Sequence, residues 1–269
     1  MTHAKIIGFI SIKGGVGKTS TVANIGTILS ANHHKKVLLV DANFSGPNLG
    51  LLFGFTQPSF TLHDVLEGRV PINKAIYEHS SGVHLLPAAL LSRKIDTAQF
   101  KKYLHSLRNQ YDMILIDSSP CLNEEILATI NASDELFILT TPDYVTLAST
   151  MHALKTSKEK KVRVSGIILN KIRGKNYELG LEMIEDLTKT PVVALLDYDS
   201  KILKALSKTT PAALLSPNSS AIVSYKKLAS ALIGERFHDK RFISNFKRIF
   251  SKGLSKEDIN RAIVMESHY

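Results

Sequence analysis

Near its start the chain carries a lysine and a threonine directly after a run of glycines, a combination that suits phosphate chemistry. Residues 14–19 read Gly-Gly-Val-Gly-Lys-Thr. Glycines let the backbone wrap closely, so that successive N–H groups can point at phosphate oxygens. The ammonium of Lys18 would neutralise the β- and γ-phosphates of a nucleotide, and the hydroxyl of Thr19 would ligate Mg²⁺. These residue types together predict a phosphate-binding loop.

The elements on either side of this turn must present it correctly. An apolar run begins at Ile6 and leads into the glycines, and a helical pattern follows from Thr19 to Leu29. A strand, a loop and a helix in this order aim the positive end of the helix dipole at the bound phosphates. Ile12 replaces the first glycine of the usual pattern G-x-x-x-x-G-K-[ST], and Lys13 follows it. The loop is therefore a variant with one additional lysine.

The stretch from Lys13 to Thr19 (KGGVGKT) resembles the deviant phosphate loop of the MinD/ParA family of dimerising ATPases, and the resemblance extends to about Gly234. It implies an ATP- and Mg²⁺-dependent switch that forms a homodimer around the nucleotide. In that family the additional lysine reaches the phosphates of the partner subunit, which would be the role of Lys13. The nucleotide would be bound by Gly14, Gly15, Val16, Gly17, Lys18, Thr19 and Ser20.

Two aspartates end apolar runs in the manner expected of groups that hold magnesium. Asp117 closes the run MILID, as the Walker-B aspartate does, and would hold the metal through a water molecule. Asp41 closes the run VLLVD in the same way. In the resemblance, Asp41 belongs to the first switch and lies near the metal and the γ-phosphate. Thr19, Asp41 and Asp117 form the predicted metal site, with an ordinary strand-ending turn as the alternative for Asp117.

The second residue after Asp41 departs from the family pattern. Family members usually carry D-x-D here, whereas this chain reads Asp41-Ala42-Asn43. An asparagine can orient a water molecule through its amide oxygen but cannot accept a proton as a carboxylate can. Because phosphoryl transfer depends mainly on positioning and charge stabilisation, we expect slow hydrolysis rather than none. The predicted catalytic residues are Lys13, Lys18, Asp41 and Asn43, and a purely turn-forming role for Asn43 remains open.

The residues that would read the nucleotide base give a weaker signal. Asn170 follows an apolar run and resembles the strand-end asparagine that reads adenine in this family. GTPases of related fold use N-K-x-D, but Arg173 stands where the acid would be. The pattern therefore favours ATP. The segment from Pro191 to Asp199 resembles the loop that packs on adenine, although its last three residues, Asp-Tyr-Asp, depart from the usual proline-containing form.

Short apolar runs alternate with helical segments along the chain. Near-continuous hydrophobicity is typical of strands that are buried on both faces of a parallel sheet. The alternation predicts an α/β fold: a doubly wound, mostly parallel sheet with helices on both faces and its ligand site at the carboxyl ends of the strands. The expected strands are Val37–Asp41, Val83–Leu86, Met113–Asp117, Leu136–Thr140, Val164–Leu169 and Val192–Leu196. Further helices are expected over Thr97–Asn109, Glu124–Ala132, Val145–Lys158, Glu178–Leu187 and Ile202–Ser207.

Composition limits the environment and the partners. The single cysteine provides neither a disulfide framework nor a Cys-x-x-Cys metal site, which suits a reducing cytoplasm. We expect no signal peptide, and no apolar run is long enough to span a bilayer. The formal net charge of +10 favours an anionic partner, with a membrane surface and DNA as the natural candidates. We expect one ATPase domain over residues 1–234 and a basic appendage over residues 235–269.

The appendage contains a stretch, Arg236 to Leu254, with six basic residues and one acid. On a helical wheel its apolar residues fall within an arc of about 140°. Such a helix suits the surface of an anionic membrane. Packing against the domain itself or against a partner protein is the alternative, and DNA is the less favoured partner. The apolar residues are Phe242, Ile243, Phe246, Ile249, Phe250 and Leu254.

These expectations combine into one hypothesis and two alternatives. The hypothesis is a cytoplasmic ATPase switch that dimerises with ATP, associates peripherally with membrane in that state, and helps to position a cellular structure. One alternative is a P-loop ligase or kinase, which would need a small-molecule pocket that the sequence does not reveal. The other is a nucleotide-dependent scaffold without hydrolysis, for which Asn43 is the main argument.

Overall fold

A single twisted sheet forms the centre of the molecule. The structure, a computed structural model, describes residues 3–90 and 95–237. The strand order in these residues is β3-β4-β2-β5-β1-β6-β7-β8, and only the β3–β4 pair is antiparallel. The predicted doubly wound, mostly parallel α/β sheet is therefore confirmed. The strands are β1 (Lys5–Ile10), β2 (Val37–Ala42), β3 (Tyr77–Glu78), β4 (His84–Leu86), β5 (Met113–Ser118), β6 (Glu135–Thr140), β7 (Arg163–Ile172) and β8 (Val192–Asp197).

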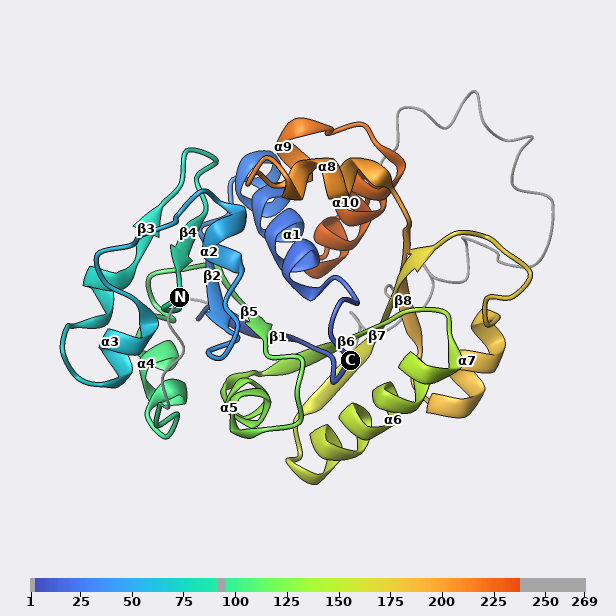
Figure 1. Ribbon diagram of the computed structural model, residues 1–269, viewed down its shortest axis with the longest axis horizontal. Helices are drawn as coiled ribbons and strands as arrows, with labels where there is room; N and C mark the ends of the chain where they lie inside the picture. The colour runs from blue at the N-terminus through green and yellow to red at the C-terminus, as the bar shows by residue number, and fades with distance from the viewer. Residues whose placement is uncertain (1–2, 91–94, 238–269) are drawn as a thin grey trace.

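Helices cover both faces of this sheet. Figure 1 shows α1, α8, α9 and α10 on one face and α4, α5, α6 and α7 on the other. Because parallel strands need crossover connections, the helices alternate with the strands along the chain. The helices are α1 (Lys18–His33), α2 (Leu49–Leu52), α3 (Leu62–Leu66), η1 (Ile72–Ala75), α4 (Phe100–Ser106), α5 (Glu124–Ala132), α6 (Tyr144–Glu159), α7 (Leu181–Thr188), α8 (Ser200–Leu206), α9 (Ala212–Leu215) and α10 (Ser220–Leu232).

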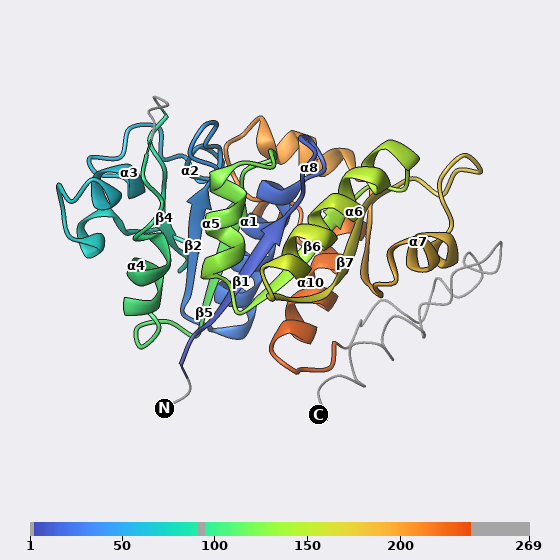
Figure 2. The same ribbon diagram turned by 90° about the horizontal axis from the view of Figure 1, so that it is seen from below.

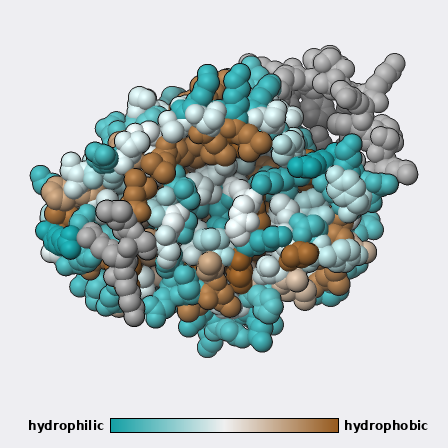
Figure 3. Space-filling view, viewed as in Figure 1, coloured by the Kyte–Doolittle hydropathy of each residue, from teal (hydrophilic) through white to brown (hydrophobic). Residues whose placement is uncertain are grey.

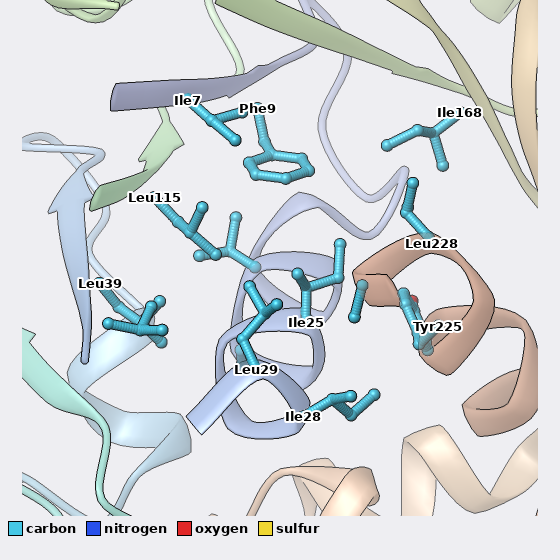
Figure 4. Packing of buried hydrophobic residues seen from close by; sticks show 14 of the residues in the cluster. Ile7, Phe9, Ile25, Ile28, Leu29, Leu39, Leu115, Ile168, Tyr225 and Leu228 are labelled. Atoms are coloured by element: carbon cyan, nitrogen blue, oxygen red, sulfur yellow. The ribbon is translucent and has the colours of Figure 1, made fainter. Parts of the chain in front are cut away.

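Successive residues of each strand serve opposite faces of the sheet. Ile7 and Phe9 of β1 belong to the same buried cluster as Ile25 of α1 (Figure 4). Ile6 points the other way and belongs to the cluster that contains Leu104 of α4. Because side chains alternate with a period of two along a strand, apolar runs such as that of β1 can fill two cores at once.

Helix α1, which follows the glycine loop, is held between the sheet and α10. A Cβ atom at Gly26 would lie 2.5 Å from Cδ2 of Leu39, so only glycine lets α1 approach β2 this closely. On its other side, the Thr21 hydroxyl lies 3.2 Å from the phenol oxygen of Tyr225 on α10, and both groups are buried. The loop at the start of α1 is therefore carried by a helix with little freedom to shift.

The structure changes several predicted boundaries. β7 runs beyond the expected Leu169 to Ile172, because Ile172 pairs with Asp197 of β8. α4 covers fewer residues than the predicted 97–109, because backbone bonds of the i to i+3 type close its end. Helix α10 and the short elements α2, α3, η1, β3 and α9 were not predicted.

The predicted amphipathic segment, Arg236 to Leu254, lies almost entirely outside the described residues, as does most of the proposed appendage. The last described helix, α10, ends at Leu232, close to the predicted domain boundary at residue 234. None of the helices formed by the described residues combines the length and the apolar character that a transmembrane span needs.

Candidate functional site

The glycine loop lies between β1 and α1 at the carboxyl end of the sheet. Gly17, the N-cap of α1, has a left-handed backbone with φ 101°, a conformation that glycine adopts without strain. A Cβ atom there would also collide with the side-chain amide of Asn170. That amide donates a hydrogen bond to the Val16 carbonyl over 2.7 Å. The end of β7 thus supports the loop directly, which sequence spacing did not reveal.

A cavity of about 570 Å³ opens beside this loop. The exposed Leu203 and Leu206 of α8 also line it. Figure 3 shows a band of apolar residues across the upper half of this face of the molecule. The cavity brings together residues that are far apart in the chain, as a nucleotide site would require. The predicted site residues that line it are Gly14, Gly15, Gly17, Lys18, Thr19, Ser20, Asn43 and Asn170.

Asp41 and Asp117 lie side by side at the ends of β2 and β5, where they are paired in the parallel register. The Asp41 carboxylate accepts backbone N–H bonds from Asn43, Asn48 and Leu49, over 3.2, 3.1 and 2.9 Å. These bonds fix the loop that follows β2. Asp41 therefore has a clear structural task in addition to the predicted one near a metal.

Asp117 has no such support. Neither of its buried carboxylate oxygens has a hydrogen-bond partner of normal geometry among the described residues. Burial raises the pKa of Asp117 to about 6, against the opposing influence of the Thr19 hydroxyl and the Lys18 ammonium. Burial and the neighbouring charge of Asp117 raise the pKa of Asp41 to about 8. The ionised pair is unfavourable without a cation.

The donor set at this point fits magnesium. Mg²⁺ prefers hard oxygen ligands, and one or two carboxylates with a hydroxyl and water are a common set. The oxygens of Asp117, which lack a hydrogen-bond partner of normal geometry in the described chain, could serve as such ligands. The Thr19 hydroxyl lies close by, and Asp41 is the neighbour of Asp117 in the sheet. Lys18 is also buried, and burial lowers its pKa while the charge of Asp117 opposes that change. A bound phosphate would satisfy its charge.

Asn43 stabilises the turn in the loop that follows β2. The Asn43 side-chain amide donates a short hydrogen bond to the Gly46 carbonyl, and the Asn48 amide donates to the same oxygen over 2.8 Å. Ser45 in turn bonds the carboxylate of Glu125 at the start of α5. In this conformation Asn43 is a turn-forming residue that also lines the cavity, so both interpretations of its role stay consistent with the structure.

Lys13 points toward its own α6. Its Nζ lies 3.0 Å from the Thr146 hydroxyl and 3.8 Å from Oδ1 of Asp143, the N-cap residue of α6. Partial burial would raise the pKa of Asp143, but hydrogen bonds from Thr141 and Thr146 and the charge of Lys13 lower it. The ammonium is thus held beside the loop by contacts that join residues about 130 positions apart. No sequence pattern predicted this partner.

Tyr198 follows β8, and its backbone N–H donates a hydrogen bond to the Ile172 carbonyl over 2.8 Å. The Arg173 guanidinium covers one face of its ring, 4.5 Å from the centroid. Tyr198 is partly exposed and lines the cavity. The only sequence signal for Tyr198 was that it belongs to the Asp-Tyr-Asp stretch, which departs from the proline-containing family pattern.

The comparisons agree with this geometry. The family model described as an AAA domain matches residues 4–166. The septum site-determining protein MinD of Synechocystis is 30% identical over 240 residues, which are 86% of this chain and 90% of that protein. This chain belongs to the MinD/ParA family of ATPases. This membership agrees with the mostly parallel sheet and with the variant glycine loop.

Two solved members of the MinD/ParA family resemble this chain over most of its length. MinD of Pyrococcus horikoshii, solved in complex with Mg-ADP, has a TM-score of 0.80 and 30% identity, and covers 85% of this chain and 96% of its own. MinD of Aquifex aeolicus, solved as a MinC:MinD complex, has a TM-score of 0.76 and 29% identity, and covers 88% of this chain and 99% of its own.

The carboxylate pair predicts a distinctive pH dependence of stability. A carboxyl group whose pKa is raised by folding stabilises the fold fully below its ordinary pKa, 3.8, and loses that contribution as the pH rises through the folded value. The metal-free protein should therefore lose stability between about pH 4 and pH 8. Asp117→Asn should recover on the order of 3 kcal/mol of the loss at pH 8, for a shift of about two pKa units.

Thermal unfolding of the metal-free protein at pH 5 and pH 8 measures this effect. Asp186→Asn, a change at an exposed carboxylate of α7, is the matched control and should follow the wild type. If Asp117→Asn leaves the difference in melting temperature between the two pH values unchanged, the unfavourable pair is not the cause.

Proposed function

We propose that this protein is an ATP-driven switch of the nucleotide-dependent cell-division or partitioning type. It binds ATP and Mg²⁺ in the cavity at the glycine loop, dimerises in that state, and hydrolyses ATP slowly. The observation that carries the proposal is the buried Asp117 carboxylate, without a partner of its own, next to Lys18 and Thr19. The Mg-ADP complex of the related Pyrococcus MinD supports the choice of ligand.

Each side chain of the site has a defined task in this proposal. The loop amides and the dipole of α1 bind the phosphates, and Lys18 neutralises the transferring group. Mg²⁺ would be held by Thr19 and, through water, by Asp117, and would offset the developing negative charge. Asp41 orders the loop that carries Asn43. Asn43 orients the attacking water through its amide oxygen, while its amide nitrogen donates to the Gly46 carbonyl.

Dimerisation requires Lys13 to change partners. In the described conformation it contacts Thr146 and lies near Asp143 of its own chain. In the ATP-bound dimer it reaches the phosphates in the partner subunit, where a charge-assisted contact is stronger than the present, partly exposed one. ATP thereby controls self-association through this one lysine.

Location depends on the dimer. We propose that the protein is cytoplasmic and joins an anionic membrane through residues 236–254 when ATP is bound, since two helices held in one dimer bind with avidity. A partner protein is also part of the proposal, because the related Aquifex protein was solved in complex with MinC. DNA remains the less favoured partner.

The dimer is tested first. Lys13→Ala should retain ATP binding but lose the ATP-dependent dimer, whereas Lys18→Ala should weaken binding itself, by about 10-fold or more for the loss of a charged contact. Light scattering with and without Mg-ATP, together with calorimetry, measures both. Asp143→Asn keeps a good N-cap for α6 and removes the opposing charge, so it should dimerise at lower protein concentration. Normal dimerisation of Lys13→Ala would refute the role of this lysine.

The rate is tested at Asn43. Asn43→Asp supplies a carboxylate and should raise ATP turnover by up to about 10²- to 10⁴-fold. Asn43→Ala is the control, because it also removes the bond to Gly46 but adds no base. Phosphate release under saturating Mg-ATP is the measurement. An equal effect of both substitutions would assign Asn43 to the loop alone, and an absence of turnover in the wild type would favour the scaffold.

The base end of the cavity is tested at Tyr198. A base stacked on an aromatic ring gains about 1–3 kcal/mol, so Tyr198→Ala should weaken ATP binding by about 5- to 150-fold. Tyr198→Phe keeps the ring and should bind normally. Binding of inorganic tripolyphosphate should not change in either variant, since it has no base. Calorimetry that finds ATP binding by Tyr198→Ala unaltered would exclude the ring as a platform.

A further inference from the structure

A second cavity, with a volume of about 830 Å³, lies between α4, α5 and the turn that joins α6 to β7. The described residues of its lining are mostly polar, and none of them is aromatic. The charged residues of the lining are Lys101, Lys160, Lys161, Arg163, Glu124 and Asp134. Cations therefore outnumber acids there by four to two.

The turn itself is strongly basic. Between residues 155 and 163 five cations accompany a single acid, Glu159, and all of them are exposed. Within the described part of the chain, the four lysines make no ion pair. We call this set, defined by Lys155, Lys158, Lys160, Lys161 and Arg163, the basic turn.

Besides Glu159 within the turn, two neighbouring acids, Asp134 and Glu135, already have other partners. Asp134 accepts from the Arg108 guanidinium over 2.6 Å and from the Ile6 N–H over 2.8 Å. Glu135 bonds the Lys5 ammonium over 2.8 Å and the hydroxyl of Ser165 over 2.6 Å. The four lysines of the basic turn therefore create a positive potential over this surface, which Glu159 offsets only in part.

The basic turn lies at the amino ends of the strands, opposite the glycine loop. Figure 2 shows the end of α6 at the same end of the sheet as the end of α10. There the carboxylate of Glu235, three residues after α10, bonds His33 at the end of α1 over 2.8 Å. The chain thus passes into the basic, phenylalanine-containing sequence after residue 236 at this same end.

We propose that the basic turn contacts the phosphate headgroups of an anionic membrane, as a second attachment beside residues 236–254. This inference rests on the proposed membrane association and adds a site within the folded domain. The four lysines carry compact charges on flexible stems, which suit attraction to a charged plane, and lack the planar fork with which arginine reads bases. Among the described residues, the cavity beside them also offers no aromatic ring on which the bases of a single-stranded nucleic acid could stack.

The test uses the full chain with vesicles of phosphatidylcholine that contain phosphatidylglycerol. A lysine near an anionic surface changes binding by about fivefold, so the triple variant Lys158→Gln, Lys160→Gln, Lys161→Gln should bind about 10- to 100-fold more weakly at low salt. Raising the salt concentration should reduce the difference between the wild type and this variant. Pure phosphatidylcholine vesicles should bind neither.

The matched control removes the same charge at the other end of the sheet, with Lys201→Gln, Lys204→Gln and Lys208→Gln in and after α8, and should bind like the wild type. Equal loss by both triple variants, unchanged binding by the first, or a wild type that ignores the vesicles would overturn the inference. Capture by duplex DNA in place of vesicles, lost in the first variant, would also overturn it. ATP-dependent dimerisation and the vesicle binding of Phe246→Glu, measured separately, test the proposed function independently.

Discussion

The close approach of two buried carboxylates is the constraint on which the site depends. Asp41 and Asp117 are neighbours because β2 and β5 pair in register at the carboxyl end of the sheet. Burial in a medium of low dielectric makes their joint ionisation unfavourable. Backbone N–H groups donate to the Asp41 carboxylate and so stabilise its ionised form, whereas the oxygens of Asp117 lack a partner within the described chain. A divalent cation would remove the remaining cost, so the fold is built to favour metal binding.

The same carboxylates connect the site to the segments that follow β2 and β5. The bonds that Asp41 accepts hold the loop after β2, and Ser45 of that loop contacts Glu125 at the start of α5. The segment that leads from Asp117 into α5 is thereby tied to the segment that carries Asn43. A change at the metal or the phosphate would reach both segments together, because they share these contacts.

Charge is divided between the two ends of the sheet. The carboxyl end concentrates phosphate-binding amides, Lys18 and the acids that would hold magnesium. The amino end carries the basic turn, whose lysines have no acidic partner in the described chain. Separation of the two regions would let a soluble anionic ligand and the proposed anionic surface bind at the same time without competition for the same cations.

Short-range patterns in the sequence were sufficient for the fold class and the loop. The run before Gly14, the glycines themselves and the helix after Lys18 follow one another directly, and strands buried on both faces show as unbroken apolar runs. The acids Asp41 and Asp117 were found in the same way, since each ends such a run. Local periodicity and spacing are properties of neighbouring residues, so they are visible without the tertiary structure.

Only the tertiary structure decided which distant residues meet. The contact of Lys13 with α6, the packing of Arg173 on Tyr198 and the support of Val16 by Asn170 depend on the order of the strands. Linear spacing carries no information on that order, because β1 lies between β5 and β6 although neither is near it in the chain. The basic residues of the turn were likewise visible in the sequence, but only the fold showed that two neighbouring acids, Asp134 and Glu135, are bonded elsewhere.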